Sequence, residues 1–146
     1  PLDNVNALLS FAYSLLASDC AAALESAGLD PYVGFLHRAR PGRRSLALDL
    51  MEELRTVLAD RFVLSCINQK VLNAKHFEKQ ENGAVLLTEE GRRAFLNAWQ
   101  QKKREVITHP FLKEKLCWGL VPYVQALLLA RTLRGDLEVY PPFFWK

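Results

Sequence analysis

Residues 3–28 read DNVNALLSFAYSLLASDCAAALESAG, and this stretch predicts one long helix. Asp3 or Asn4 can cap its first turn, because their side-chain oxygens accept hydrogen bonds from the unpaired N–H groups there. Gly28 is a typical residue just beyond a helix end. We expect a helix to about Ala27 that packs through a seam of residues at helical spacing: Val5, Leu9, Ala12, Leu16, Cys20, Ala23 and Ala27.

The rest of the chain predicts a mainly α fold, a compact helical domain of about five or six helices with one small β-hairpin insertion. Pro31 opens a short helical turn, and a long helical region is expected over 45–73, which can break near Asp60. The hairpin is expected at 77–80 and 84–87, because Asn82-Gly83 between them is a strong hairpin signal.

Two more helices are expected after the hairpin. Thr88 can cap a helix that extends to about Ile107, where His109-Pro110 breaks the chain. The last helix is expected over about 112–133, can kink at Pro122, and stops before Gly135. The tail after it carries Phe143, Phe144 and Trp145. These rings are too apolar to remain in water, so the tail should dock on its own domain or, alternatively, on a partner.

A candidate site lies in residues 28–53, GLDPYVGFLHRARPGRRSLALDLMEE. Asp49, Glu52 and Glu53 stand three and four positions apart, so their carboxylates cluster along one side of a helix. The loop before them can fold His37 back over that side. Such an oxygen and nitrogen donor set suits Mg²⁺ or Mn²⁺. The alternative is ordinary solvated surface, which an acidic helix face and an Arg-rich loop also resemble.

The periodicity separates the three acids. Asp49 and Glu52 share a polar stripe, whereas Glu53 falls between the polar and apolar stripes and is expected to pair with a neighbouring arginine. The loop supplies four cations that could hold phosphates: Arg38, Arg40, Arg43 and Arg44. The net charge of +3 permits nucleic-acid binding without demonstrating it. Other basic groups, such as Lys102–Arg104, are typical of solvated helix faces.

Three motifs together resemble a known family: NALLSFAYSLL (6–16), GLDPYVGFLH (28–37) and SLALDLMEELR (45–55). In this order and spacing they resemble the C-terminal helical domain of the CRISPR-associated integrase, the DNA endonuclease of spacer acquisition in antiviral defence. The resemblance runs over almost the whole chain. The closing YPPFFWK (140–146) looks like the tail of one type I branch.

The resemblance implies a single Mg²⁺ or Mn²⁺ held by a Glu, a His and an acidic residue. His37 and Glu52 fall on the family's catalytic metal ligands, and Asp49 falls on a supporting acid. The family's first ligand, a Glu, precedes the NALLSF helix; Glu25 lies beyond it and does not match. We therefore expect residues 1–146 to be one helical catalytic domain, a C-terminal fragment without the family's N-terminal β-rich domain and inactive alone.

The resemblance also implies partners: double-stranded DNA (spacer precursor and repeat), a second copy of the full-length protein, and the small CRISPR-associated ribonuclease-like protein of the adaptation complex. We expect a cytoplasmic location and no membrane partner, because no run approaches about 18 uninterrupted apolar residues. Cys20, Cys66 and Cys117 form no CxxC pair and are expected to be buried free thiols. The alternative function is a helical DNA-binding or assembly module without chemistry of its own.

Overall fold

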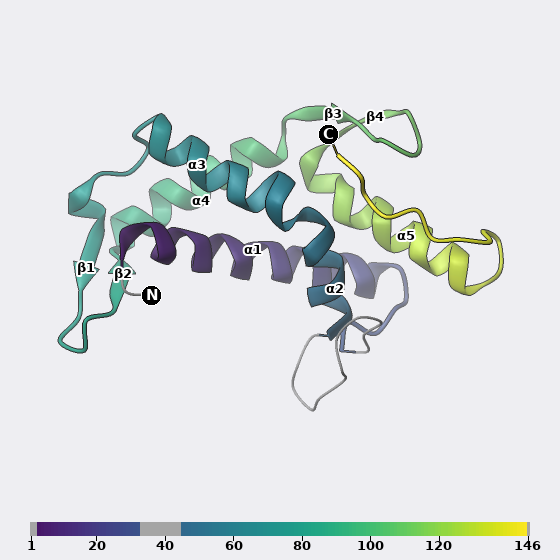
Figure 1. Ribbon diagram of the computed structural model, residues 1–146, viewed down its shortest axis with the longest axis horizontal. Helices are drawn as coiled ribbons and strands as arrows, with labels where there is room; N and C mark the ends of the chain where they lie inside the picture. Colours follow the sequence, from purple (N-terminus) through teal and green to yellow (C-terminus); the bar gives the residue numbers. More distant parts are fainter. Residues whose placement is uncertain (1–2, 33–44, 146) are drawn as a thin grey trace.

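The computed structural model describes residues 3–32 and 45–145, which form a mainly helical fold (Figure 1). Its helices are α1 (Asn4–Ser26), α2 (Ser45–Leu54), α3 (Arg61–Asn68), α4 (Glu89–Lys103) and α5 (Val121–Leu133). Two antiparallel hairpins accompany them: β1 (Phe77–Lys79) with β2 (Val85–Leu87), and β3 (Val106–Thr108) with β4 (Lys115–Cys117). Short 3₁₀ turns cover Ala74–His76 and Trp118–Leu120. The predicted fold class is confirmed.

Helix α1 is the long central element of the fold, as predicted. Asp3 caps it by accepting a hydrogen bond from the backbone N–H of Asn6, and Gly28 lies just beyond its end with a φ of +79°. The predicted seam was only partly right, because Val5 is 47% exposed. The buried side instead comprises Ala7, Leu8, Ala12, Leu16, Cys20, Ala21, Ala23 and Leu24. By length and composition alone, α1 could cross a membrane, but the core helices of globular proteins pass the same test. In this structure α1 contributes to the hydrophobic core.

Helices α2 and α3 are joined without a loop by a π-helical turn, Arg55–Asp60. The predicted break near Asp60 is therefore a change of helical register and not an interruption. The helix ends at Asn68, earlier than predicted, and Lys70 just beyond it has a φ of +54°. In this region Phe62 packs between Phe95 and Trp99, with ring centroids 5.0 and 5.1 Å away. These contacts join α3 to α4.

The first hairpin and the start of α4 agree with local signals in the sequence. Phe77 pairs with Leu87 across the predicted Asn82-Gly83 turn, and Gly83 has a φ of +88°. The Thr88 hydroxyl accepts a hydrogen bond from the N–H of Gly91, as expected of a cap. Gly91 itself is required by packing, because a Cβ there would lie 2.5 Å from the backbone oxygen of His76.

The second hairpin was not predicted, and the predicted end of α4 and the predicted start of α5 were wrong. Helix α4 ends at Lys103, and residues 106–108 form β3, which pairs with β4 at 115–117. The β-branched run Val106-Ile107-Thr108 favours a strand over a continued helix. Helix α5 begins at Val121, so Pro122 lies in its first turn and causes no kink. A missing N–H is tolerated at that position because it has no partner within the helix.

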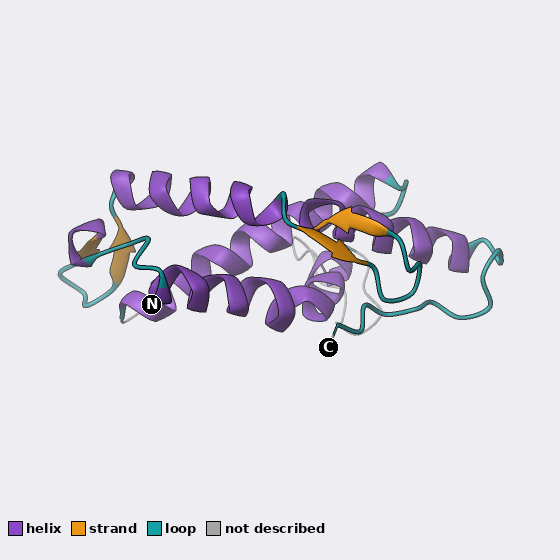
Figure 2. Cartoon of the chain, turned by 90° about the horizontal axis from the view of Figure 1, so that it is seen from above, coloured by secondary structure: helices purple, strands orange, loops and turns teal. Residues whose placement is uncertain are grey.

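The C-terminal segment, residues 140–145, runs back along α5 towards β3 and β4 (Figures 1 and 2). Phe143 is 4% exposed, and its ring lies 5.4 Å from that of His109 and 5.8 Å from that of Trp118. Trp145 contacts Trp118 edge to face. The prediction that the tail docks on its own domain is confirmed, although Phe144 is 75% exposed.

Candidate functional site

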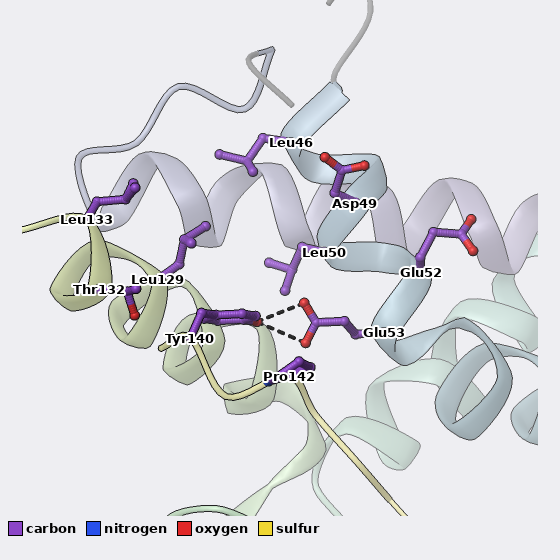
Figure 3. A pocket seen from close by; sticks show the side chains of 10 residues that line it. All are labelled: Leu46, Asp49, Leu50, Glu52, Glu53, Leu129, Thr132, Leu133, Tyr140 and Pro142. Atoms are coloured by element: carbon purple, nitrogen blue, oxygen red, sulfur yellow. Dashed lines mark hydrogen bonds between the residues drawn. The ribbon is translucent and has the colours of Figure 1, made fainter. Parts of the chain in front are cut away.

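Helix α2 carries the acidic residues that the sequence singled out. The backbone N–H groups of Leu46 and Ala47 donate to the carbonyl of Pro31, and these hydrogen bonds attach the first turn of α2 to the segment after α1. Asp49 is buried at 6% exposure, whereas Glu52 is exposed. Figure 3 shows the Glu52 carboxylate on one side of α2 and that of Glu53 on the other, directed towards Tyr140.

Glu52 belongs to a short chain of polar contacts that ends on α1. The guanidinium of Arg55 donates to Glu52 Oε1 at 3.0 Å and lies 6.0 Å from the ring centroid of Tyr13. The Tyr13 hydroxyl in turn donates to Asp60, and this hydrogen bond is the main reason that the pKa of Tyr13 is raised. Tyr13 is thus half-buried and ties both ends of the π-helical turn to α1.

Among the residues that the structure describes, Glu53 pairs with no arginine, so the predicted ion pair is not found there. Its carboxylate instead accepts hydrogen bonds from the Tyr140 hydroxyl at 2.8 and 2.9 Å, from the Phe143 N–H at 2.9 Å and from the Gln125 amide at 3.2 Å. Burial raises the pKa of Glu53, and these hydrogen bonds partly oppose the shift by stabilising the anion. The C-terminal segment therefore supplies donors where a cation was expected.

Gln125 extends this network to the β3–β4 hairpin. Its side-chain oxygen lies 2.7 Å from His109 Nε2, and both residues are fully buried. His109 Nδ1 accepts from the N–H groups of Phe111 and Leu112, so a neutral ring carries its proton on Nε2 and donates to Gln125. The burial and contacts of His109 make it a structural residue.

The raised pKa of Glu53 predicts a specific pH dependence of stability. Because the folded protein binds this proton more tightly than the unfolded chain, the carboxyl's contribution to the free energy of unfolding grows as the pH falls through its raised pKa. The contribution is lost again as the pH rises above that value. We expect the wild type to gain stability relative to Glu53→Gln between pH 7 and pH 5.

Urea unfolding of both proteins across this range measures the difference. Glu53→Gln should be less stable at every pH, because the NH₂ group of glutamine would face the O–H and N–H groups that donate to Glu53. Only the change of the stability difference with pH tests the shifted pKa. A difference that stays constant with pH, or that favours the wild type more at pH 7, would contradict the assignment.

A cavity of about 580 Å³ lies beside these carboxylates, between α2, the end of α5 and the C-terminal segment (Figure 3). Five of its ten lining residues are leucine or proline, and three are acidic residues of α2. The lining residues are Leu46, Asp49, Leu50, Glu52, Glu53, Leu129, Thr132, Leu133, Tyr140 and Pro142. The cavity therefore places a water-accessible apolar surface next to the candidate metal ligands.

The structure brings together only part of the predicted site. Asp49 and Glu52 lie one turn apart on α2, but His37 and the arginines Arg38, Arg40, Arg43 and Arg44 fall outside the described residues. Within residues 3–32 and 45–145, no group of three or more His, Cys, Asp or Glu side chains is arranged to hold a metal ion. The two carboxylates offer hard oxygen donors, which fit Mg²⁺ or Mn²⁺ better than a thiophilic metal.

The cysteines do not contribute to this site. Cys20 and Cys66 are buried free thiols, as predicted, while Cys117 is only partly buried. Burial raises the pKa of Cys66 to about 11, so its thiol stays protonated at neutral pH.

Sequence reasoning missed three residues that shape the surroundings of the site: Arg55, Gln125 and Tyr140. The spacing of Glu52 and Arg55 within the predicted helix could have suggested their ion pair, because residues three apart lie side by side on a helix. Nothing local indicates Gln125 or Tyr140, since both reach Glu53 from distant parts of the chain.

Comparison with known proteins decides the family. A family model described as the CRISPR-associated protein Cas1 matches residues 1–101. The chain belongs to the Cas1 family. It is 63% identical over all 146 residues to "CRISPR-associated endonuclease Cas1 2" of Rhodospirillum rubrum, and 53% identical to a Cas1 endonuclease of Chlorobaculum tepidum. It spans 42% and 43% of these two Cas1 proteins, less than half of each.

Two solved structures share the fold of this chain. A casposase bound to its integration product matches with a TM-score of 0.87 and 31% identity over 99% of this chain and 42% of that one. A Cas1 protein from Thermotoga maritima matches with a TM-score of 0.83 and 30% identity over 92% of this chain and 41% of that one. The family resemblance of the sequence motifs is thereby confirmed, and the helical fold is that of a defined part of Cas1.

Proposed function

We propose that this chain is the helical catalytic part of a metal-dependent DNA endonuclease and integrase that inserts new spacers into a CRISPR array. The observation that carries the proposal is the 63% identity, over the entire chain, to a protein named a Cas1 endonuclease. The similarity to a casposase solved with its integration product supports DNA strand transfer as the reaction. On α2, Asp49 and Glu52 provide the oxygen donors that such chemistry needs.

Glu52 and His37 would hold a Mg²⁺ or Mn²⁺ ion, with Asp49 as a supporting acid. When bound, the ion would polarise the scissile phosphate and neutralise charge on its oxygens. Glu52 is exposed and paired with Arg55 by an ion pair open to solvent, which a divalent cation can displace at little cost. Arg55 would then be released beside the site as a cation for the DNA backbone.

The reaction conserves the number of phosphodiester bonds. The 3′-hydroxyl of a captured DNA end attacks a phosphodiester of the repeat, forming a new P–O bond while the bond to the leaving 3′-oxygen breaks. The attacking hydroxyl loses its proton to solvent, and the leaving oxygen gains one. Because one ester replaces another, neither ATP nor a covalent enzyme intermediate is required.

The direct test is a strand-transfer assay with protein expressed from the complete gene, end-labelled double-stranded DNA and a repeat-containing target. With Mn²⁺ or Mg²⁺ we expect joined products, and with EDTA none. DNA binding that weakens with salt, without cleavage or joining under any metal condition, would instead support the alternative of a non-catalytic DNA-binding or assembly module.

The proposed partners rest on the same kind of similarity. A Cas6-RT-Cas1–Cas2 complex contains a chain that matches this one with a TM-score of 0.79 at 28% identity. We propose that this protein also assembles with a second copy of itself and with a small Cas2-type partner on double-stranded DNA. A cytoplasmic location is proposed, which the free thiols of Cys20 and Cys66 support.

The proposal predicts that the arginines of the 38–44 loop bind the DNA backbone. Replacing Arg40, Arg43 and Arg44 together should weaken binding to unrelated duplexes by similar factors. It should also flatten the slope of log K against log salt by up to about three units, one for each lost phosphate contact. Titrations at several salt concentrations measure this, and Arg93→Ala, on the exposed face of α4, serves as the single-charge control. An unchanged slope would mean that the loop arginines contact no phosphate.

A further inference from the structure

The side chain of Glu53 connects the C-terminal segment, residues 140–145, to α2 by hydrogen bonds. The Tyr140 hydroxyl and the Phe143 backbone N–H each donate a hydrogen bond to the carboxylate. These two residues lie 87 and 90 positions from Glu53 in the sequence. The same tyrosine oxygen accepts a hydrogen bond from Gln125 at 2.7 Å, and Gln125 also donates to the carbonyl of Pro141. Each group in this partly buried network therefore has a partner from another part of the chain.

Helix α2 continues directly into the π-helical turn Arg55–Asp60. This turn holds about one residue more than an α-helical turn would, and such turns are rare and short. On one side of it, Tyr13 contacts both Arg55 and Asp60 and thereby links the turn to α1. On the other side, the hydrogen bonds to Glu53 are the corresponding restraint. The register of α2 is thus fixed from both directions.

We propose that Tyr140 is a positioning residue for the metal site. Through Glu53, Tyr140 fixes the rotation of α2 about its own axis and the position of α2 along that axis. The inference rests on the proposed function, because it takes Glu52 as a ligand of the cation and Asp49 as its supporting acid. Neighbouring residues of an α-helix are related by a turn of about 100° and a rise of about 1.5 Å. A restraint on Glu53 is therefore transmitted directly to Glu52, whose carboxylate projects from the other side of α2 (Figure 3).

Tyr140→Phe tests the proposal because it removes the hydroxyl and keeps the ring. Residues that orient metal ligands typically change metal affinity by about 10- to 100-fold when they are replaced. We expect Tyr140→Phe to weaken Mn²⁺ binding about tenfold, measured by electron paramagnetic resonance of free Mn²⁺ with protein from the complete gene. This measurement of affinity does not depend on DNA or on turnover.

Two matched controls separate positioning from a general loss of stability. Thr88→Ala removes the N-cap of α4, at the end of α1 far from α2, and should leave Mn²⁺ affinity unchanged (Figure 1). Phe144→Ala alters an exposed ring in the same C-terminal segment and should also bind as the wild type does. If Tyr140→Phe stays within about twofold of wild type, below the range expected for such residues, or if Thr88→Ala loses as much affinity, the proposal is overturned.

A double variant tests whether Tyr140 acts through Glu53. If it does, adding Tyr140→Phe to Glu53→Gln should weaken Mn²⁺ binding no further than Glu53→Gln alone, because the shared contact is already lost. Fully additive losses would overturn the proposed route. A wild-type protein that binds no Mn²⁺ gives a different result, since it would refute the metal site of the proposed function and this inference with it.

Discussion

Replacing Glu52 by alanine should reduce metal-dependent strand transfer at least about 100-fold, the upper end of the loss seen when residues that merely support a metal ligand are replaced. The fold should survive, because the ion pair of Glu52 with Arg55 is exposed to solvent and such pairs contribute at most about 1 kcal/mol. Glu52→Asp keeps a carboxylate and should retain part of the activity. Product formation at saturating Mn²⁺, together with the thermal unfolding midpoint, measures both effects.

Glu89→Ala is the matched control for this experiment. Glu89 is an exposed glutamate at the start of α4 that pairs with Arg93, so its loss should leave strand transfer at the wild-type level. If Glu52→Ala remains as active as Glu89→Ala, Glu52 cannot be a metal ligand. If both variants lose activity in proportion to their stability, the effect is one of folding and not of metal binding.

Replacing Phe143 by alanine should lower the free energy of unfolding by about 3 kcal/mol, the lower end of the cost of deleting a buried phenylalanine side chain. Its ring is almost fully buried against Trp118 and His109, so the substitution empties space that these rigid side chains cannot fill. Urea unfolding, analysed at constant m-value, measures the loss.

Phe144→Ala provides the comparison within the same segment. Its ring is largely exposed, and its removal should change the free energy of unfolding by no more than about 0.5 kcal/mol. Equal effects of the two substitutions would show that the C-terminal segment does not pack on Trp118 in solution. A large effect of Phe144→Ala alone would mean that the opposite face of the segment is the buried one.

The elements predicted well from the sequence are those that local chemistry specifies. The Asp3 cap, the end of α1 before Gly28, the Asn82-Gly83 turn and the Thr88 cap each depend on residues within four positions of one another. Sequence spacing also placed Asp49 and Glu52 one turn apart on the same helix. The fold class could be inferred from the helical periodicity of these segments.

The features that could not be predicted depend on contacts between distant parts of the chain. The partner of Glu53 is a tyrosine 87 positions away, and no local pattern distinguishes this from an ion pair with a nearby arginine. The β3–β4 hairpin lacks an Asn-Gly turn, and its apolar residues can also be read as the ends of two helices. His37 and the loop arginines remain predictions, because they lie outside the described residues.

The π-helical turn has a consequence for how this part of the chain tolerates changes in length. Because it contains a residue in excess of α-helical geometry, deleting one residue within Arg55–Asp60 would allow α2, the turn and α3 to become one regular helix. Such a helix would turn the acidic side of α2 by about 100° relative to the apolar side of α3. Because of the extra residue, the continuous helical segment from α2 to α3 directs Glu52 to solvent and also brings Phe62 into the aromatic core.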